Sequence, residues 1–196
     1  MFEALPRDAW RAYRDQDFPT RSWTAEADVI RALAEGPRVH LISRKRYGDF
    51  ELHFDWCVAE GGNSGVLYRV SEDYEEPWHS GLEMQLLDDP RHPDGMNPTT
   101  ACGALYDLLP SSLMEPVPPS MFVTACIVVR GTAVEHWLAN QLVLSYDLSD
   151  PTFRRHVTQS KFKDYPAFGT VPEGHIVLQH HGTGAAFRNL RIRELD

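Results

Sequence analysis

The chain has 196 residues, of which 42% are hydrophobic and 24% are charged, and its formal net charge is -9 at pH 7. These values are typical of a globular protein, and we expect one domain spanning residues 1–196. The negative charge argues against nucleic acid as a partner, because phosphates would be repelled. No segment approaches the roughly 18 consecutive apolar residues of a membrane span, so no membrane partner is expected.

The N-terminus and the cysteines bear on the compartment. Residues 1–15 lack the apolar core of a signal peptide. We therefore expect a cytoplasmic protein, or an exported one if a signal has been trimmed. The three cysteines, Cys57, Cys102 and Cys126, show no metal-ligand spacing and are expected to be free, buried thiols. Nothing in the sequence indicates an oligomeric state.

Short alternating segments follow one another along the chain. Residues 21–36 are ambiguous, because their alanine, glutamate and leucine favour a helix whereas Val29 and Ile30 allow strands. Residues 51–58 are the clearest strand, with hydrophobic side chains on one face and polar ones on the other. The same alternation predicts further strands at residues 65–70, 82–87, 121–130, 133–140, 141–148 and 175–180. Many short strands indicate an all-β protein, an antiparallel sandwich or a barrel.

Glycine, asparagine and proline mark the connections between these segments. Residues 60–65 and 130–132 are expected to form hairpins, because glycine and asparagine tolerate a positive φ angle. Two long proline-rich loops, residues 88–103 and 110–120, interrupt the strands. Ordered loops of this length in compact domains are often functional.

Polar side chains share one face of two neighbouring predicted strands. Glu83 and Gln85 lie opposite the apolar face of residues 82–87, and Arg69 lies on the preceding strand. If both strands belong to one sheet, the three side chains could converge. A solvated face with a surface ion pair is the alternative. Carboxylate, amide and guanidinium groups together nevertheless suit the recognition of hydroxyl groups.

The C-terminal strand carries a second polar set. In residues 175–181, Gln179 and His181 share one face, whereas His180 lies on the other. Only one of the two histidines can therefore point toward a given site.

Signatures of better-known chemistries are missing from the sequence. An ordinary glycosidase needs two carboxylates about 5–10 Å apart. Asp88 has the wrong parity to face Glu83, and Asp89 lies roughly 20 Å along a straight strand. The sequence contains no GxSxG, GxGxxG, phosphate-loop or HExxH motif, so serine-hydrolase and nucleotide chemistry have no support. None of the nine histidines shows HxH or HxxxH spacing, so we expect no catalytic transition-metal site. The loop with Asp88, Asp89, Asp94 and Asn97 could hold calcium, although a solvated loop is the simpler interpretation.

Four aromatic residues could stack on sugar rings: Tyr68, Trp78, Tyr106 and Trp137. Such side chains more often belong to the core. Trp78 lies in the polar segment YEEPWHSG and is the least suited to burial.

Seven segments, taken in order, resemble the 3-keto-disaccharide hydrolase domain family. They are GDFELHFDW, GGNSGVLYRV, GLEMQLLDD, CGALYDLLP, IVVRGTAVEHWLANQLVLSYDL, SKFKDYPAFG and GHIVLQHHGTGAAFRNLRIREL. The resemblance covers about residues 23–195. Each segment alone has low specificity, whereas seven in register are specific.

The resemblance implies a concanavalin A-like jelly roll, in which residues 21–36 form strands and the C-terminal polar segment, residues 178–189 with Arg188 and Asn189 at its end, runs through the sheet of the sugar site. Phe187 and Leu190 have opposite parity, so a bulge is expected between them. The recurrent polar positions of the family correspond here to Asn63, Arg69, Glu83, Gln85, Gln179 and His181, with Lys161 nearby. His180 falls where the family often has another polar residue.

The resemblance also implies cleavage of a glycoside already oxidised at C3, through removal of the C2 proton and elimination at C1. Glu83 or His181 would be the base, and Arg69 or Lys161 would stabilise the oxyanion. The substrate-binding residues would be Gln85, Gln179, Asn63, Trp78, Tyr106 and His180.

No cofactor is required for this reaction, although a divalent metal held by His181 and Glu83 could replace the cationic group. The alternative function is a non-catalytic, lectin-like carbohydrate-binding module. A small carbohydrate is the expected partner in either case.

Overall fold

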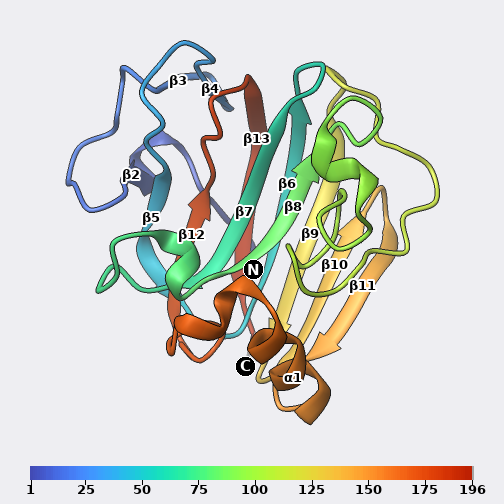
Figure 1. The fold of residues 1–196 in the computed structure, drawn as a ribbon. Helices are drawn as coiled ribbons and strands as arrows, with labels where there is room; N and C mark the ends of the chain where they lie inside the picture. The colour runs from blue at the N-terminus through green and yellow to red at the C-terminus, as the bar shows by residue number, and fades with distance from the viewer. Residues whose placement is uncertain (196) are drawn as a thin grey trace.

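The computed structural model describes residues 1–195, which form two β-sheets packed face to face (Figure 1). The eight strands of the larger sheet are β1 (Glu3–Ala4), β3 (Trp23–Glu26), β4 (Val29–Ala32), β6 (Phe50–Val58), β9 (Val123–Arg130), β10 (Ala133–Leu138), β11 (Gln141–Asp147) and β13 (Ala185–Glu194). The five strands of the smaller sheet are β2 (Trp10–Ala12), β5 (Leu41–Tyr47), β7 (Asn63–Val70), β8 (Leu82–Leu87) and β12 (Gly174–Leu178).

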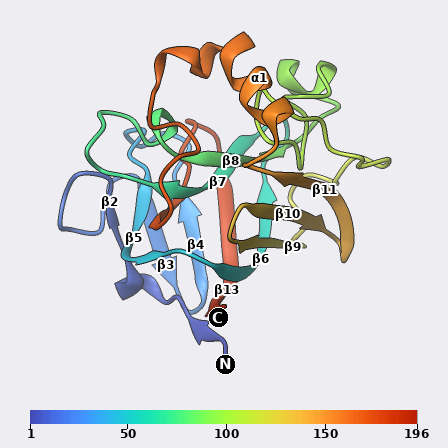
Figure 2. The same ribbon diagram turned by 90° about the horizontal axis from the view of Figure 1, so that it is seen from below.

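The strand order brings distant parts of the chain together. The larger sheet has the order β11-β10-β9-β6-β13-β4-β3, with β1 paired to β13, and the smaller sheet has the order β2-β5-β12-β7-β8. All the pairs described are antiparallel. The two layers are seen from below in Figure 2. The structure therefore confirms the expected antiparallel β-sandwich.

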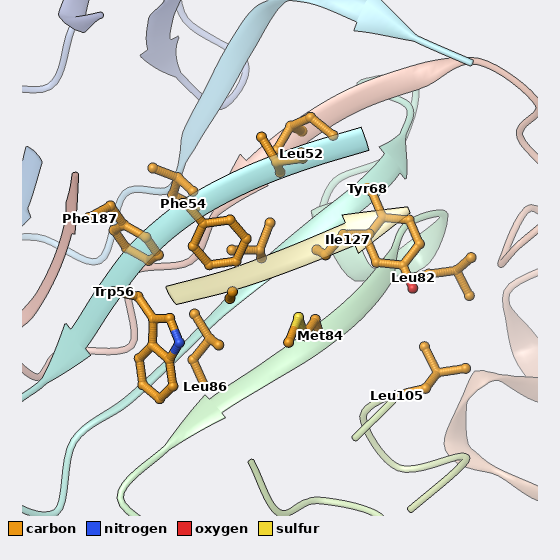
Figure 3. Close-up of a cluster of buried hydrophobic side chains, with 14 of the residues drawn as sticks. Leu52, Phe54, Trp56, Tyr68, Leu82, Met84, Leu86, Leu105, Ile127 and Phe187 are labelled. Carbon is orange, nitrogen blue, oxygen red and sulfur yellow. The ribbon is translucent and has the colours of Figure 1, made fainter. Parts of the chain in front are cut away.

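The core lies between the two sheets. Strand β6 alternates buried and half-buried residues along its whole length, as its sequence predicts. Leu52, Phe54 and Trp56 of β6 lie in one cluster with Met84 and Leu86 of β8 (Figure 3). Burying one large apolar side chain contributes about 1.5–3 kcal/mol. This alternation also turns the intervening polar residues away from the core.

The ambiguous segment near the N-terminus forms strands. β3 and β4 pair with each other, and β4 also pairs with β13. Trp23 and Ile30 are buried. Tertiary pairing and burial therefore outweigh the local helix propensity, and the strands implied by the resemblance are confirmed.

One of the two expected hairpins is wrong. Residues 130–132 form the predicted turn between β9 and β10. Residues 60–65, by contrast, do not connect neighbouring strands of one sheet, because β6 belongs to the larger sheet and β7 to the smaller one. β6 pairs with β9 and β13 instead, so the chain crosses between sheets at this turn.

Two bulges shift the side chains of their strands. In β13 the register changes between Arg188 and Arg191, Asn189 has a φ of 52°, and the bulge expected there is confirmed. In β7 Arg69 has a φ of 56°. As a result Val70 joins Leu67 in an outer apolar cluster instead of following Tyr68 into the core. Simple alternation fails at such a residue because the extra residue changes the face.

Short helices complete the structure. An α-helix not expected from the sequence is α1 (Pro151–Gln159), whose N-terminus is capped by the Asp150 side chain. Four 3-10 turns are present: η1 (Arg7–Ala9), η2 (Pro77–His79), η3 (Pro93–Met96) and η4 (Lys161–Asp164). Within residues 1–195, no helix is both long enough and apolar enough to cross a membrane. All three cysteines are free, with Cys102 and Cys126 buried and Cys57 half-buried.

Candidate functional site

A pocket of about 520 Å³ lies over the outer face of the five-stranded sheet. Nine of the ten residues predicted from the sequence line it: Asn63, Trp78, Glu83, Gln85, Tyr106, Lys161, Gln179, His180 and His181. The exception is Arg69. The sequence thus predicts residues that lie together in one pocket, while the roles assigned to them stay predictions.

Strand alternation builds the floor of the pocket. Leu82, Met84 and Leu86 of β8 face the core, so Glu83 and Gln85 face outward. Gly65 of β7 lies directly opposite Gln85. A Cβ atom at Gly65 would lie 2.1 Å from Oε1 of Glu83. The glycine therefore leaves the space that the Glu83 carboxyl group occupies.

The environment of Glu83 disfavours its charged form. The residue is only 7% exposed. Burial raises the pKa of Glu83 from 4.5 to about 8, and the opposing effects of the Lys161 ammonium and the Gln179 amide are smaller. Glu83 therefore holds its proton at neutral pH.

Three buried amide oxygens on the floor have no hydrogen-bond partner among residues 1–195: Asn63 Oδ1, Gln85 Oε1 and Gln179 Oε1. The Gln85 amide is oriented by its Nε2, which donates to the Thr100 carbonyl at 3.2 Å. Buried polar atoms normally have partners. Three free acceptors in one pocket are suited to a ligand that donates several hydrogen bonds, such as a polyol.

The open edge of β8 is covered by a loop that carries a further site residue. The backbone N–H of Tyr106 donates to the Glu83 carbonyl, and the backbone N–H of Gly103 donates to the Gln85 carbonyl. In the core, His136 Nδ1 donates to the Gly103 carbonyl at 3.0 Å, which steadies this loop from behind. Burial raises the pKa of Tyr106 to about 12, so its phenol is a hydrogen-bond donor at neutral pH.

Lys161 supplies a positive charge at the rim. It begins η4, whose N-terminus is capped by the Ser160 side chain. The Lys161 Nζ lies 4.2 Å from the centre of the Tyr106 ring and 3.8 Å from the Asp107 carboxylate. Phe162, the next residue, is buried and stacks on Phe168, which anchors the turn.

His40, His180 and His181 form another wall of the pocket. The His180 ring is fully hydrogen-bonded, because Nε2 donates to the Leu33 carbonyl and Nδ1 accepts from the Gly182 backbone N–H. His180 is thus a support for its neighbour His181, which lines the pocket and is only partly exposed. Burial, followed by the charge of Arg38, lowers the pKa of His181 below 6.5. The His181 imidazole is therefore neutral at pH 7.

The expectation that Arg69 converges with Glu83 and Gln85 on one surface is wrong. Its Nη2 donates to the Gly131 carbonyl at 2.6 Å and lies 3.6 Å from the Asp49 carboxylate. Both partners lie in turns at the end of the sandwich. The bulge at Arg69 redirects the side chain from the outer face toward these turns.

The polar residues of β13 also lie elsewhere. The resemblance implied that Arg188 and Asn189 share the sheet of the sugar site, but β13 belongs to the larger sheet. Arg188 Nε and Asn189 Nδ2 donate to the Asp55 carboxylate, at 3.2 and 2.7 Å. Only the start of the C-terminal polar segment, from Gln179 to His181, reaches the pocket.

Five lining residues were not expected from the sequence: Arg38, His40, Glu76, Phe162 and Tyr165. Phe162 and Tyr165 lie in the segment SKFKDYPAFG, which already contained Lys161, and Glu76 lies in the loop of Trp78. Arg38 and His40 precede β5 in a segment without any pattern. His40 Nδ1 accepts from the His180 backbone N–H at 3.0 Å, so only the folded chain reveals its connection to the site.

Backbone N–H groups of the protein donate hydrogen bonds to the polar side chains of the aspartate-rich loop, residues 88–97. Asp88 Oδ2 accepts from the Gly61 backbone N–H, and Asp89 Oδ1 accepts from the Cys102 backbone N–H, each at 2.8 Å. Asn97 Oδ1 accepts from the Thr99 backbone N–H at 3.1 Å. These contacts favour a structural loop over a calcium site.

A family comparison and a comparison with curated proteins agree on the family that this chain resembles. Residues 2–193 match the 3-keto-alpha-glucoside-1,2-lyase-like domain family. A 3-keto-disaccharide hydrolase from Bacteroides thetaiotaomicron is 30% identical over 226 residues, an alignment that covers 100% of this chain and 78% of the relative.

Solved structures agree with this assignment. A crystal structure from Parabacteroides distasonis, provisionally described as a glycosyl hydrolase, has a TM-score of 0.90 and 25% identity and covers 100% of this chain and 94% of its own. A carbohydrate-binding module from Bacillus subtilis has a TM-score of 0.58 with 13% identity over 95% of this chain and 96% of its own, and it supports the fold alone.

Proposed function

Because the chain belongs to the 3-keto-alpha-glucoside-1,2-lyase-like family, we propose that it cleaves glycosides that carry a ketone at C3, by removing the C2 proton and eliminating the substituent at C1. The observation that carries this proposal is the buried carboxyl group of Glu83 on a floor of unpartnered amide oxygens. Those oxygens suit sugar hydroxyls, and the carboxyl group suits proton transfer.

An ordinary retaining glycosidase needs two carboxyl groups about 5 Å apart. Two carboxyl groups line the pocket, Glu76 from the segment before η2 and Glu83 from strand β8. Elimination beside a ketone needs no such pair.

The bond changes of the proposed reaction begin at C2. The C3 ketone acidifies the C2 proton, and its removal leaves an enolate. When the enolate collapses, the C3 carbonyl forms again, a C1–C2 double bond forms, and the bond from C1 to the leaving oxygen breaks as that oxygen takes a proton. Water then adds to C1 and C2 regains a proton, so the net reaction is hydrolysis.

The environments of the two titratable groups suggest their roles. His181 is neutral at pH 7 and can accept the C2 proton, whereas Glu83 is protonated and can give a proton to the leaving oxygen. The sequence alone left the choice of base open between them. Of the two cations expected at the enolate oxygen, Lys161 lines the pocket and Arg69 does not, so we assign this role to Lys161. A metal held by His181 and Glu83 stays a prediction.

The first experiment is a hydrolysis assay of 3-keto-glucosides beside their unoxidised parents, with and without a chelator. We expect cleavage of the keto compounds only. Glu83→Gln should lower kcat by about 100- to 10,000-fold, the usual contribution of a general acid, while sugar binding persists. Glu60→Gln, at an exposed position outside the pocket, is the control. If the wild type binds sugars but cleaves neither class, the protein is a binding module.

The pH dependence tests the assignment of roles. We expect kcat/KM to rise as His181 loses its proton below pH 6.5 and to fall as Glu83 loses its proton near pH 8. A rate that instead rises through pH 8 and stays high would make Glu83 the base.

A further inference from the structure

A second cluster of polar side chains lies on the outer face of the eight-stranded sheet, across the sandwich from the pocket. Glu51 and His53 alternate on β6, and Cys126 lies opposite His53 on the neighbouring strand β9. One ligand atom from each of the three residues lies within 4.8 Å of the other two. We propose that Glu51, His53 and Cys126 bind a divalent transition-metal ion, with zinc as the best match.

The distances between the ligand atoms agree with this proposal. Cys126 Sγ lies 3.6 Å from His53 Nε2. Tetrahedral zinc, with bonds of about 2.3 Å to sulfur and about 2.0 Å to nitrogen, holds such atoms roughly 3.5 Å apart. Glu51 Oε1 lies 2.6 Å from His53 Nε2 in a hydrogen bond. A metal would take the place of the shared proton, and the flexible glutamate would retreat by less than about 1 Å.

The chemistry of the three ligands narrows the choice of ion. A thiol, an imidazole and a carboxylate form a mixed set that suits zinc or cobalt and does not suit calcium or magnesium, which prefer oxygen alone. The ligands come from two paired strands of a sheet, so their backbone positions are fixed before the ion arrives. Arg193 contacts the other oxygen of Glu51, Oε2, and so orients the carboxylate as outer-sphere partners of metal ligands do.

The surroundings leave room for a further ligand. The cluster lines a hollow of about 290 Å³ that also contains Glu135 and Trp137. Trp137 Nε1 donates to Glu135 Oε2 at 2.8 Å, which holds a second carboxylate at the hollow. The ring of Phe2 stands edge-on against His53 at 5.1 Å and covers it from one side. Water or Glu135 can complete the coordination from the open side.

Titration with cobalt(II) tests the site directly, because a cobalt–thiolate bond gives a sulfur-to-metal charge-transfer band in the near ultraviolet. We expect the band to saturate at one ion per chain in the wild type and to disappear in Cys126→Ser. The matched control is Cys57→Ser, since Cys57 lies on β6 with outward parity but lines a different hollow. This variant should keep the band. Absence of the band in the wild type, or its persistence in Cys126→Ser, overturns the proposal.

A second variant guards against misfolding of the cysteine mutant. His53→Gln should weaken zinc binding, measured by competition with a chromophoric chelator, by at least about 10-fold, which is the loss that outer-sphere changes alone can cause. Zinc should also raise the melting temperature of the wild type and not that of His53→Gln. Equal zinc affinity in wild type and His53→Gln would contradict the assignment.

Discussion

The outer faces of the two sheets carry the same kinds of polar residue but use them differently. On the larger sheet the Asp55 carboxylate accepts hydrogen bonds from Thr124, Arg188 and Asn189. Although burial acts in the opposite direction, the hydrogen bonds from Asn189, Thr124 and Arg188 together hold the pKa of Asp55 below its ordinary value. On the smaller sheet, burial raises the pKa of Glu83 to about 8.

This difference distinguishes polar residues that stabilise the fold from those whose hydrogen-bonding groups are left for a ligand. Around Asp55 the donors come from the protein itself. Around Glu83 the amide oxygens of Asn63, Gln85 and Gln179 have no partner within residues 1–195. Because an unpartnered buried polar group is costly, the gathering of three such amide oxygens in one pocket indicates where the protein binds something.

After that of Glu83→Gln, the largest expected effect on activity is that of replacing Lys161, which is compared here with a second lysine. Lys161→Met should lower kcat/KM by about 100- to 1,000-fold, the usual loss when one donor to a developing oxyanion is removed. Lys45→Met removes an exposed lysine that pairs with Glu194, far from the pocket lining. It should change activity by less than about twofold, because exposed ion pairs contribute little. Steady-state kinetics on a 3-keto-glucoside check both, and equal losses would remove Lys161 from the mechanism.

A similar comparison is available for two glycines. Gly65→Ala places a methyl group 2.1 Å from Glu83 Oε1 and must displace that carboxyl group, whereas Gly48→Ala meets its nearest atom at an ordinary 3.7 Å. Because a displacement of about 1 Å at a reacting group can cost about 100-fold, Gly65→Ala should lose activity on that scale. Gly48→Ala should keep it. Full activity in a folded Gly65→Ala protein would show that the position of Glu83 is not critical.

The two carboxyl groups should respond to pH with opposite signs. The raised pKa of Glu83 gives stability that is present below pH 4.5 and is lost as pH rises toward 8. Holding this proton at pH 7 costs up to about 3 kcal/mol, so Glu83→Gln should stabilise the protein by about 1–3 kcal/mol there. The lowered pKa of Asp55 gives stability that is lost at low pH, so Asp55→Asn should destabilise.

Urea denaturation at pH 5 and pH 7.5 measures the Glu83 effect, whereas the loss from Asp55→Asn should be the same at both values and should shrink only below pH 3.8. The gain from Glu83→Gln should widen between these two values. A gain that does not change with pH would mean that the carboxyl group is not held protonated.

The smallest expected effect on catalysis belongs to Arg69. Its bonds to the Gly131 carbonyl and the Asp49 carboxylate are structural. Arg69→Met should lower the free energy of unfolding by about 1–3 kcal/mol, the usual cost of losing a buried charged hydrogen bond. It should leave kcat/KM within about threefold, measured below the melting transition. A large loss of activity without a loss of stability would mean that Arg69 takes part in catalysis.

Much of the site could be read from alternation along single strands. Glu83 and Gln85 face outward because Leu82, Met84 and Leu86 must face the core, and this follows from the period of the strand alone. The prediction failed for Arg69 because a bulge adds one residue and reverses the face. Local sequence gives little warning of such a bulge, since Arg is not a typical residue for a positive φ angle.

The sequence by itself determined the class of fold, the outward positions on β8 and the family, because periodicity and motifs are local properties of the chain. Only the tertiary structure decided that β7, β8 and β12 meet in one sheet while β13 joins the other. It also decided that His40 lies behind His180 and that Asp55, not a ligand, receives Arg188. These contacts join residues more than 100 positions apart, and their formation depends on how two whole sheets pack.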